Sequence, residues 1–499
     1  MGIVQRDSIR ITIISYIGAA IGYFNKILLF PNFLSTEQVG LANILINISV
    51  VYAQFSALGM PWVTLRFFPY FNDKHKQHHG FLFWILFVSL LGFLIVTLLF
   101  FTFQSTIISY YTDNSPLLVE YILYIIPMGL ATMLYGLFDV YLRSLMKSVV
   151  PSFINEIVLR LFITISISLY ALKLVTFHEF VIIYVAFNCS ISVILLLYMA
   201  FLKQLLITPQ WSLLIKRLFR ILLNFGFFAI LSNMSYILMT NIDSIMVASM
   251  LGLKETGIYT TIFFISAIML IPYRSLARVA SPIVAQYWKS RQMHKMFDLY
   301  KKVTLMNIIS GCFLFLVLWV NIDNLFSFIP KEYALGKYVF LFLGLGRLFD
   351  MITGVNGIIL VTSKKYRYDL LFALLLIVLM ITMNLFFIPR YGITGASIGT
   401  MITLIIYNSL RIFYILKVFK MQPFDVKSIL VLAISGITFV ILYCIPFLFN
   451  VYIDIIIRSS VCLMLYMIPI YFLKISSEVN EYIQNILKTV RLYLLKRKN

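Results

Sequence analysis

The sequence consists of long apolar blocks that are separated by short polar breaks. A helix of about 20 apolar residues crosses the hydrocarbon core of a bilayer, and the blocks recur at about that length. The composition agrees, because 62% of the 499 residues are apolar and only 12% are charged. Soluble domains have about 45–50% apolar and about 25% charged residues. We therefore predict an all-α integral membrane protein, and a soluble globular fold is excluded.

The apolar blocks and their interruptions predict about 14 transmembrane helices. Six fall within residues 1–203 and six within 221–417, and each series forms one predicted lobe. A last pair falls within 418–474. Residues 204–220 are interpreted as a cytoplasmic linker between the lobes, and 475–499 as a basic cytoplasmic tail. The predicted architecture is two six-helix lobes followed by a C-terminal helix pair.

A weak internal repeat supports the division into two lobes. The segment Glu37-Gln38-Val39-Gly40 resembles Glu255-Thr256-Gly257, and the two glycines are 217 residues apart. Since six spans return the chain to the side on which it began, the two copies share one orientation. Such repeats are related by an axis along the membrane normal, and transporters place their substrate site between them. We therefore expect a two-lobed transporter.

The distribution of basic residues indicates the topology. The chain has 40 Lys and Arg against 19 Asp and Glu, a formal net charge of +21. With the N-terminus in the cytoplasm, most of the basic residues fall in inner loops and tails, as the positive-inside rule requires. Both termini are then cytoplasmic, because the predicted number of spans is even. A nucleic-acid reader carries its basic residues on an exposed soluble face, so nucleic acid is excluded as a partner.

No cofactor and no metal site is predicted. The four cysteines fall inside apolar segments without a pairing spacing, which favours ordinary packing. His75, His78 and His79 are close in sequence, but Lys74 and Lys76 beside them favour a hydrated inner loop. The sequence contains no Walker motif, so direct drive by ATP is not expected.

Several charged residues within the predicted spans have an opposite charge one helical turn away. Residues three or four positions apart share a helix face, so each such pair can be neutralised within its own helix. The predicted intrahelical ion pairs are Asp139 with Arg143, Glu156 with Arg160, Arg347 with Asp350, and Asp454 with Arg458.

Four charged residues lack such a neighbour: Lys26, Asp243, Arg274 and Arg278. Each therefore needs a partner from another helix or a ligand, which makes it a candidate for function. Long basic side chains near helix ends also reach the lipid headgroups, and Lys26 and Arg278 have that alternative. For Asp243 two roles stay open, a coupling site for a cation or proton and a structural or gating contact.

Several stretches, taken in their order along the chain, resemble the multidrug/oligosaccharidyl-lipid/polysaccharide exporter superfamily. Within it, the chain is most similar to the Wzx-type flippases of lipid-linked oligosaccharides, and the resemblance covers nearly the whole length. The stretches are residues 30–41, 58–67, 241–252, 257–260 and 389–399, the last reading Pro-Arg-Tyr-Gly-Ile-Thr-Gly-Ala-Ser-Ile-Gly.

The resemblance implies a transporter, not an enzyme, that alternates access by rocking its lobes. Wzx-type flippases move an undecaprenyl-diphosphate-linked oligosaccharide from the inner to the outer leaflet of the bacterial cytoplasmic membrane, for export of O-antigen, capsule or exopolysaccharide. Membrane lipid and polysaccharide polymerase machinery are the implied partners.

The resemblance also implies which basic residues contact the substrate. The related lipid II flippases line their cavity with basic residues on the first, second and eighth spans, and Lys26, Arg66 and Arg274 fall on these spans here. Arg66 lies at the inner end of its span, and Arg278 follows Arg274 by one turn. Cations from both lobes would then bind the diphosphate, with arginine suited to bidentate contact.

The two alternatives to a flippase are an antiporter and a membrane glycan enzyme. A cation-coupled multidrug or metabolite antiporter of the same superfamily usually has 12 spans and an acidic cavity, so the extra pair within 418–474 disfavours it. A membrane glycan polymerase or ligase works on a large outer loop, whereas the longest outer break here, 323–338, is short. We therefore expect a flippase.

Overall fold

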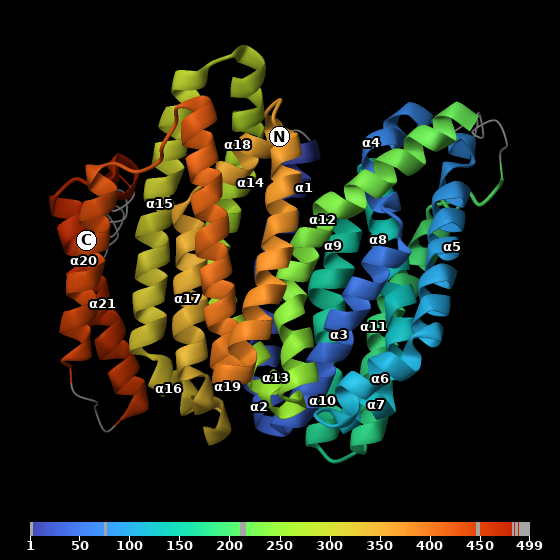
Figure 1. Ribbon diagram of the computed structural model, residues 1–499, viewed down its shortest axis with the longest axis horizontal. Helices are drawn as coiled ribbons and strands as arrows, with labels where there is room; N and C mark the ends of the chain where they lie inside the picture. Colours follow the sequence, from blue (N-terminus) through green and yellow to red (C-terminus); the bar gives the residue numbers. More distant parts are fainter. Residues whose placement is uncertain are drawn as a thin grey trace, which may run out of the picture. The chain divides into compact units, whose positions relative to one another are not determined.

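The computed structural model describes residues 3–73, 77–209, 216–445 and 450–481, and the single positions 484 and 488. Every regular element in these ranges is a helix, which confirms the predicted all-α class (Figure 1). The predicted loop cations Lys74 and Lys76, the linker segment 210–215 and most of the predicted tail lie outside the described residues.

The chain forms two compact units. Unit 1 comprises Met1–Ile265 and Ile377–Ala396, and unit 2 comprises Ser266–Leu376 and Ser397–Asn499. Unit 1 therefore takes residues from both sides of the predicted linker at 204–220. The lobe boundaries at 203 and 221 therefore remain a prediction.

Unit 1 is built around α3 and α8, on which α4, α5, α11 and α12 pack. Its first span is continuous through a π-helical segment, and a capping box of Ser35 and Gln38 starts the second. The helices are α1 (Ile3–Tyr23), η1 (Phe24–Leu29), α2 (Phe30–Phe33), α3 (Thr36–Ser56), α4 (Met60–Phe71), η2 (Gln77–Gly80), α5 (Phe81–Thr102), α6 (Gln104–Thr112), α7 (Pro116–Tyr121), η3 (Ile122–Tyr124), α8 (Ile125–Ser144), α9 (Val149–Phe153), η4 (Ile154–Val158), α10 (Leu159–Ala171), α11 (Phe177–Phe201), α12 (Lys216–Met250) and most of α13 (Leu253–Ala267).

Unit 2 is built around α15, which packs on α14, α17, α20 and α21. The helices are α14 (Leu270–Ser290), α15 (Met293–Val320), α16 (Ile322–Phe326), η6 (Lys331–Gly336), α17 (Lys337–Ile352), α18 (Asn356–Thr362), α20 (Val426–Tyr443) and α21 (Val451–Phe472). The long helix α19 (Tyr366–Phe419) is shared, because its residues 377–396 belong to unit 1. At Gly392, φ is 57° and ψ is −139°, so α19 is two helical arms joined at a position that glycine tolerates.

Among the described residues, 10 helices are long and apolar enough to cross a membrane. The number rises to 12 if α13 with α14, and η6 and α17 with α18, each count as one bent span. Two of the six spans predicted within 221–417 fall in α19, which counts once. In α12, where the first of these six is predicted, only part of the side chains are described. A multi-pass membrane protein is thus established, and the number fourteen stays a prediction.

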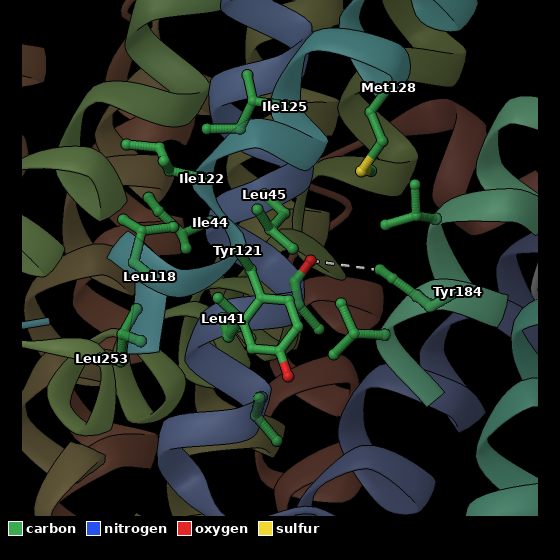
Figure 2. Packing of buried hydrophobic residues seen from close by; sticks show 14 of the residues in the cluster. Leu41, Ile44, Leu45, Leu118, Tyr121, Ile122, Ile125, Met128, Tyr184 and Leu253 are labelled. Atoms are coloured by element: carbon green, nitrogen blue, oxygen red, sulfur yellow. Dashed lines mark hydrogen bonds between the residues drawn. The ribbon is translucent and has the colours of Figure 1, made fainter. Parts of the chain in front are cut away.

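A core cluster of unit 1 consists of buried aliphatic and aromatic side chains, chiefly from α3, α7, α8 and α11 (Figure 2). Leu41 and Leu45 of α3 lie between Leu118 and Tyr184, and Leu253 of α13 joins the same cluster. The Tyr184 hydroxyl donates a hydrogen bond to the Ala42 carbonyl oxygen at 3.4 Å. These contacts fix α3 and α11, which carry the polar groups described below.

The prediction of a hydrated histidine loop is wrong for His78. Its side chain is only 1% exposed and its ring lies 5.2 Å from Phe68 and 6.5 Å from Tyr141, measured between ring centroids. The backbone turns back there, with φ of 50° at His78 and 53° at His79. Packing of the imidazole between aromatic rings outweighs the charge of the neighbouring loop. His75 lies outside the described residues.

At the start of the predicted tail, Glu478 forms an ion pair with Lys302 of α15 at 2.5 Å, and Ser476 donates a hydrogen bond to Glu478 at 2.9 Å. Burial opposes the charged form of Glu478, but the hydrogen bonds from Lys302, its own backbone N–H and Ser476 lower its pKa from 4.5 to about 2. The ionised carboxylate therefore holds the segment 476–481 to α15.

The charge of Glu478 predicts how this docking depends on pH. Because the folded pKa lies below the unfolded value of 4.5, the stabilisation is fully present above about pH 4.5 and is lost as the pH falls to about 2. For so exposed a pair it amounts to about 0.2–1 kcal/mol. At pH 7, Glu478→Gln should speed amide hydrogen exchange in 477–481 by up to about fivefold. An unchanged exchange rate would show that the apolar contacts alone dock the segment.

Candidate functional site

Lys26 lies in the π-helical segment η1 of the first span. Its Nζ atom donates a hydrogen bond to Asn43 Oδ1 at 2.6 Å and lies 3.4 Å from the Tyr184 hydroxyl. The same atom is 4.4 Å from the ring centroid of Phe30, 5.9 Å from that of Tyr184 and 5.8 Å from that of Phe264. Across the described parts of the chain, no carboxylate lies within ion-pair distance of Lys26. Neutral groups, including three aromatic rings, thus surround the ammonium.

The position of Lys26 is fixed by contacts on both sides of η1. The buried side chain of Asn25 donates to the Arg160 carbonyl oxygen at 2.9 Å and accepts from the Thr164 hydroxyl at 2.9 Å, which ties η1 to α10. On the other side, Asn43 of α3 donates to Thr260 Oγ1 of α13 at 3.0 Å. Single π-helical turns inside α-helices recur at functional sites. Lys26 is therefore a held group and not a mobile surface lysine.

The two glycines of the sequence repeat are in contact within unit 1. A Cβ atom on Gly40 would lie 2.0 Å from the Leu253 carbonyl oxygen, and one on Gly257 would lie 1.9 Å from the Thr36 carbonyl oxygen. Both positions therefore admit only glycine at this helix separation. Asn43 and Thr260, which are hydrogen bonded, are also 217 residues apart. Equivalent positions of the two copies thus meet where α3 and α13 begin.

Asp243 lies on α12 and is only 2% exposed. Its carboxylate accepts a hydrogen bond from the Tyr259 hydroxyl of α13 at 2.8 Å and another from Asn384 Nδ2 of α19 at 2.7 Å. Asp243 thus joins three helices of unit 1 through neutral donors. Neither donor was singled out by the sequence, although Asn384 is a polar residue in an apolar span, which is an available signal.

The other predicted substrate residues lie on the surface of their units. Arg66 of α4 is exposed, and its guanidinium lies 4.5 Å from the ring centroid of Phe225. Arg274 and Arg278 are exposed on α14. Because Lys26 belongs to unit 1 and Arg274 to unit 2, the convergence of these cations stays a prediction.

The structure brings three of the predicted intrahelical pairs together. Asp139 and Arg143 lie 2.7 Å apart, Glu156 and Arg160 2.5 Å apart, and Asp454 and Arg458 2.6 Å apart, each measured between nitrogen and oxygen. In the fourth pair, Asp350 accepts a hydrogen bond from Asn408 Nδ2 at 2.9 Å, and Arg347 is buried on the same helix. These charges are bonded within the protein.

The ion pair between the two arms of α19 was not predicted from the sequence. Arg411 and Asp369, from the two arms of α19, form a salt bridge inside unit 2, and Arg411 lies 4.7 Å from the ring centroid of Tyr407. A Cβ atom on Gly357 would lie 2.9 Å from the Arg411 guanidinium, so a glycine makes room for it. The partners are 42 positions apart, so helix periodicity gives no sign of the pair.

Residues 4–288 match the family described as polysaccharide biosynthesis protein, which is more than half of the chain. The chain belongs to this family. Residues 229–386 also match the MatE family. A capsular polysaccharide biosynthesis protein of Staphylococcus aureus, CapF, is 24% identical over 160 residues, which is 32% of this chain and 40% of that protein.

Solved structures show the same fold. The lipid II flippase MurJ in an inward closed conformation superposes with a TM-score of 0.73 at 18% identity, over 92% of this chain and 97% of that one. A multidrug resistance MATE family transporter has a TM-score of 0.61 at 14% identity, over 82% and 97%. A MATE transporter of Vibrio cholerae gives 0.53 at 12% identity, over 83% and 98%. Together with the two family matches, this shared fold confirms the predicted exporter superfamily. This member of the polysaccharide biosynthesis family has the fold of these transporters.

Proposed function

We propose that the protein is a flippase that moves an undecaprenyl-diphosphate-linked oligosaccharide from the cytoplasmic to the outer leaflet by alternating access of two lobes. The family match and the capsular polysaccharide relative support a role in glycan export. The fold shared with a lipid II flippase supports transport of a lipid-linked glycan. The protein would then lie in the bacterial cytoplasmic membrane with both termini inside, and it would work beside polysaccharide polymerase machinery without being an enzyme.

The observation that carries the proposal is the ammonium of Lys26. A lysine ammonium has three N–H donors, and the structure gives it one short partner, Asn43, and one long one, Tyr184. One donor and the whole positive charge are therefore available to an anion. A diphosphate supplies both a charge and several acceptor oxygens, which makes charge-assisted hydrogen bonds. The polyprenyl tail can remain in the lipid.

Arg274 and Arg278 are the proposed contacts from the second lobe. Both are exposed on α14 and one helical turn apart, which suits two contacts to one phosphate group. Arg66 is proposed as an entry contact, because it is exposed midway along α4 and its guanidinium lies over the ring of Phe225. We propose that neutral polar side chains determine which glycan is bound.

Asp243 is proposed to act in gating or coupling. Its bonds to Tyr259 and Asn384 link α12, α13 and α19, so movement of any of these helices has to break a buried hydrogen bond. Asp243→Asn keeps the size but weakens both bonds, because charge-assisted hydrogen bonds contribute about 1.5–3 kcal/mol. A movement that has to break these bonds then becomes easier, and we expect flipping to become about tenfold faster. A rate that follows an imposed Na⁺ or H⁺ gradient in the wild type but not in this variant would assign coupling. Equal sensitivity of both would assign gating.

A cation-coupled antiporter is the second candidate. The buried carboxylate of Asp243 and the match to the MatE family favour it. The additional helices α20 and α21 disfavour it, since the antiporters of this superfamily usually lack them.

Reconstitution separates the two candidates. Proteoliposomes that contain an undecaprenyl-diphosphate-linked oligosaccharide are treated with an impermeant lectin or glycosidase, and the fraction of lipid exposed on the opposite leaflet is followed with time. A flippase makes this fraction rise above that of protein-free vesicles. Absence of flipping with several glycans, together with cation-driven efflux of a small organic cation, would establish the antiporter instead.

A further inference from the structure

A pocket of about 420 Å³ lies within unit 2, whereas Lys26 and Asp243 belong to unit 1. It is formed where α15 and α20 end and where α17 and α21 begin. Its size falls in the range of small-ligand sites, which is about 300–1,000 Å³. The residues that matter to its chemistry are Trp319, Asp323, Asn324, Lys337, Asp454 and Arg458.

Two carboxylates and two cations line this pocket. Asp454 is fully buried and accepts hydrogen bonds at 2.6 Å from Arg458 Nε and at 2.6 Å from Asn324 Nδ2. Arg458 also donates to the Ile445 carbonyl oxygen at 3.1 Å. Lys337 Nζ lies 2.7 Å from Asp323 Oδ2. The charges of the four side chains sum to zero, and the pocket is therefore lined by both positive and negative groups.

Asn324 supplies an acceptor that the protein does not use. Its side chain is 2% exposed, and among the residues that the structure describes no donor reaches its Oδ1 atom. A buried amide oxygen without a donor is unfavourable. An occupant with an N–H group would remove this penalty.

The lining of the pocket indicates that it lies at the membrane interface. It lies at the ends of membrane-crossing helices, and Trp319, Tyr338 and Tyr443 line it. Trp and Tyr are enriched where the helix meets the headgroups. Along α20, which also lines the pocket, Ile437 and Val440 are 61% and 62% exposed and offer an apolar surface to acyl chains. An occupant with a polar head and long acyl chains fits this arrangement.

We propose that the pocket binds the headgroup of a glycerophospholipid that carries both a phosphate and a primary ammonium, as phosphatidylethanolamine does. The phosphate contacts Lys337 and Arg458, and the ammonium contacts Asp323 and the free oxygen of Asn324. A purely anionic headgroup would leave the carboxylates facing negative charge. A choline headgroup has no N–H to donate to Asn324. The bound lipid would join α20 and α21 to α15 and α17.

Lipid binding to the purified full-length protein, followed by native mass spectrometry, tests this. Phosphatidylethanolamine, phosphatidylglycerol and phosphatidylcholine of equal chain length are titrated separately, and soluble phosphoethanolamine is added as a competitor. We expect phosphatidylethanolamine to bind about tenfold more tightly than the other two, and soluble phosphoethanolamine to compete only weakly. Equal binding of all three lipids, or tighter binding of phosphatidylglycerol, would overturn the proposal. Full competition by phosphoethanolamine would show that a soluble phosphate compound is the ligand and would overturn the lipid assignment.

Substitutions of the charged residues that line the pocket test whether the lipid binds there. The side chains of Asp323 and Lys337 are 62% and 36% exposed, so Asp323→Asn and Lys337→Gln leave the packing intact. Each should weaken phosphatidylethanolamine binding about three- to tenfold and reduce its advantage over phosphatidylglycerol. The matched control is Lys331→Gln with Glu332→Gln, which removes one charge of each sign on exposed residues of the same segment. A loss in the control equal to that in Asp323→Asn and Lys337→Gln would refute the site.

Discussion

Replacing Lys26 by alanine is expected to abolish most flipping while the protein stays in the membrane. The ammonium is held by Asn43 and surrounded by rings, and it has no carboxylate partner among the described residues. Loss of a charge-assisted hydrogen bond to the diphosphate removes about 1.5–3 kcal/mol, which slows transport roughly 10- to 150-fold. The lectin-accessibility assay in proteoliposomes measures this rate, and membrane abundance is measured in parallel.

Conservative replacement separates charge from shape. Lys26→Arg keeps the charge and should retain a substantial part of the rate, whereas Lys26→Met keeps the length without the charge and should behave like alanine. The matched control is Lys173→Ala, which removes a cation from an exposed residue at the end of α10. If Lys26→Met transports normally, the anion site is not at Lys26. If Lys26→Arg is as inactive as alanine, the constraint is geometric.

Gly257→Val is expected to disrupt the contact between α3 and α13 and to lower both stability and transport. A Cβ atom at this position would lie 1.9 Å from a backbone carbonyl oxygen, so the helices have to separate. Overpacking of this kind destabilises by about 1–3 kcal/mol, and more where backbone has to move. Separation of the helices also lengthens the bond between Asn43 and Thr260, which positions Lys26. Thermal unfolding in detergent and the flipping assay report the two effects.

A glycine without neighbours provides the control. A Cβ atom on Gly136 of α8 would have nothing within 4 Å, so Gly136→Ala should fold normally and transport at the wild-type rate. It should even stabilise α8 slightly, since alanine is the better helix former by about 1 kcal/mol. Equal damage by Gly257→Val and Gly136→Ala would show that the close helix approach is not the cause.

The sequence predicted those features that depend on local composition. The apolar blocks predicted a helical membrane protein, the repeat marked two glycines that prove to be in contact, and the spacing of Asp139, Glu156 and Asp454 from their arginines predicted pairs that the structure contains. Each of these sequence patterns involves residues within one or two helical turns of each other, or a match between two short segments.

The features that were not predicted depend on contacts between distant segments. Tyr184 is 158 positions from Lys26, and Asn384 is 141 positions from Asp243. One sequence gives no information about which helices are neighbours, so these partners cannot be read from it. His78 shows the same limit, because the aromatic residues that bury it come from other helices.

The division of α19 between the two units has a consequence for biosynthesis. Residues 377–396 complete unit 1, yet the rest of that unit has already ended at Ile265 when they are made. The ribosome therefore has to add 141 residues after Asp243 before its donor Asn384 exists, which takes on the order of 10 s. During that interval the carboxylate of Asp243 lies in a partly assembled bundle and lacks one of its hydrogen bonds. Unit 1 thus cannot finish folding during synthesis of its own first segment, and its assembly has to wait for most of the following chain to be inserted.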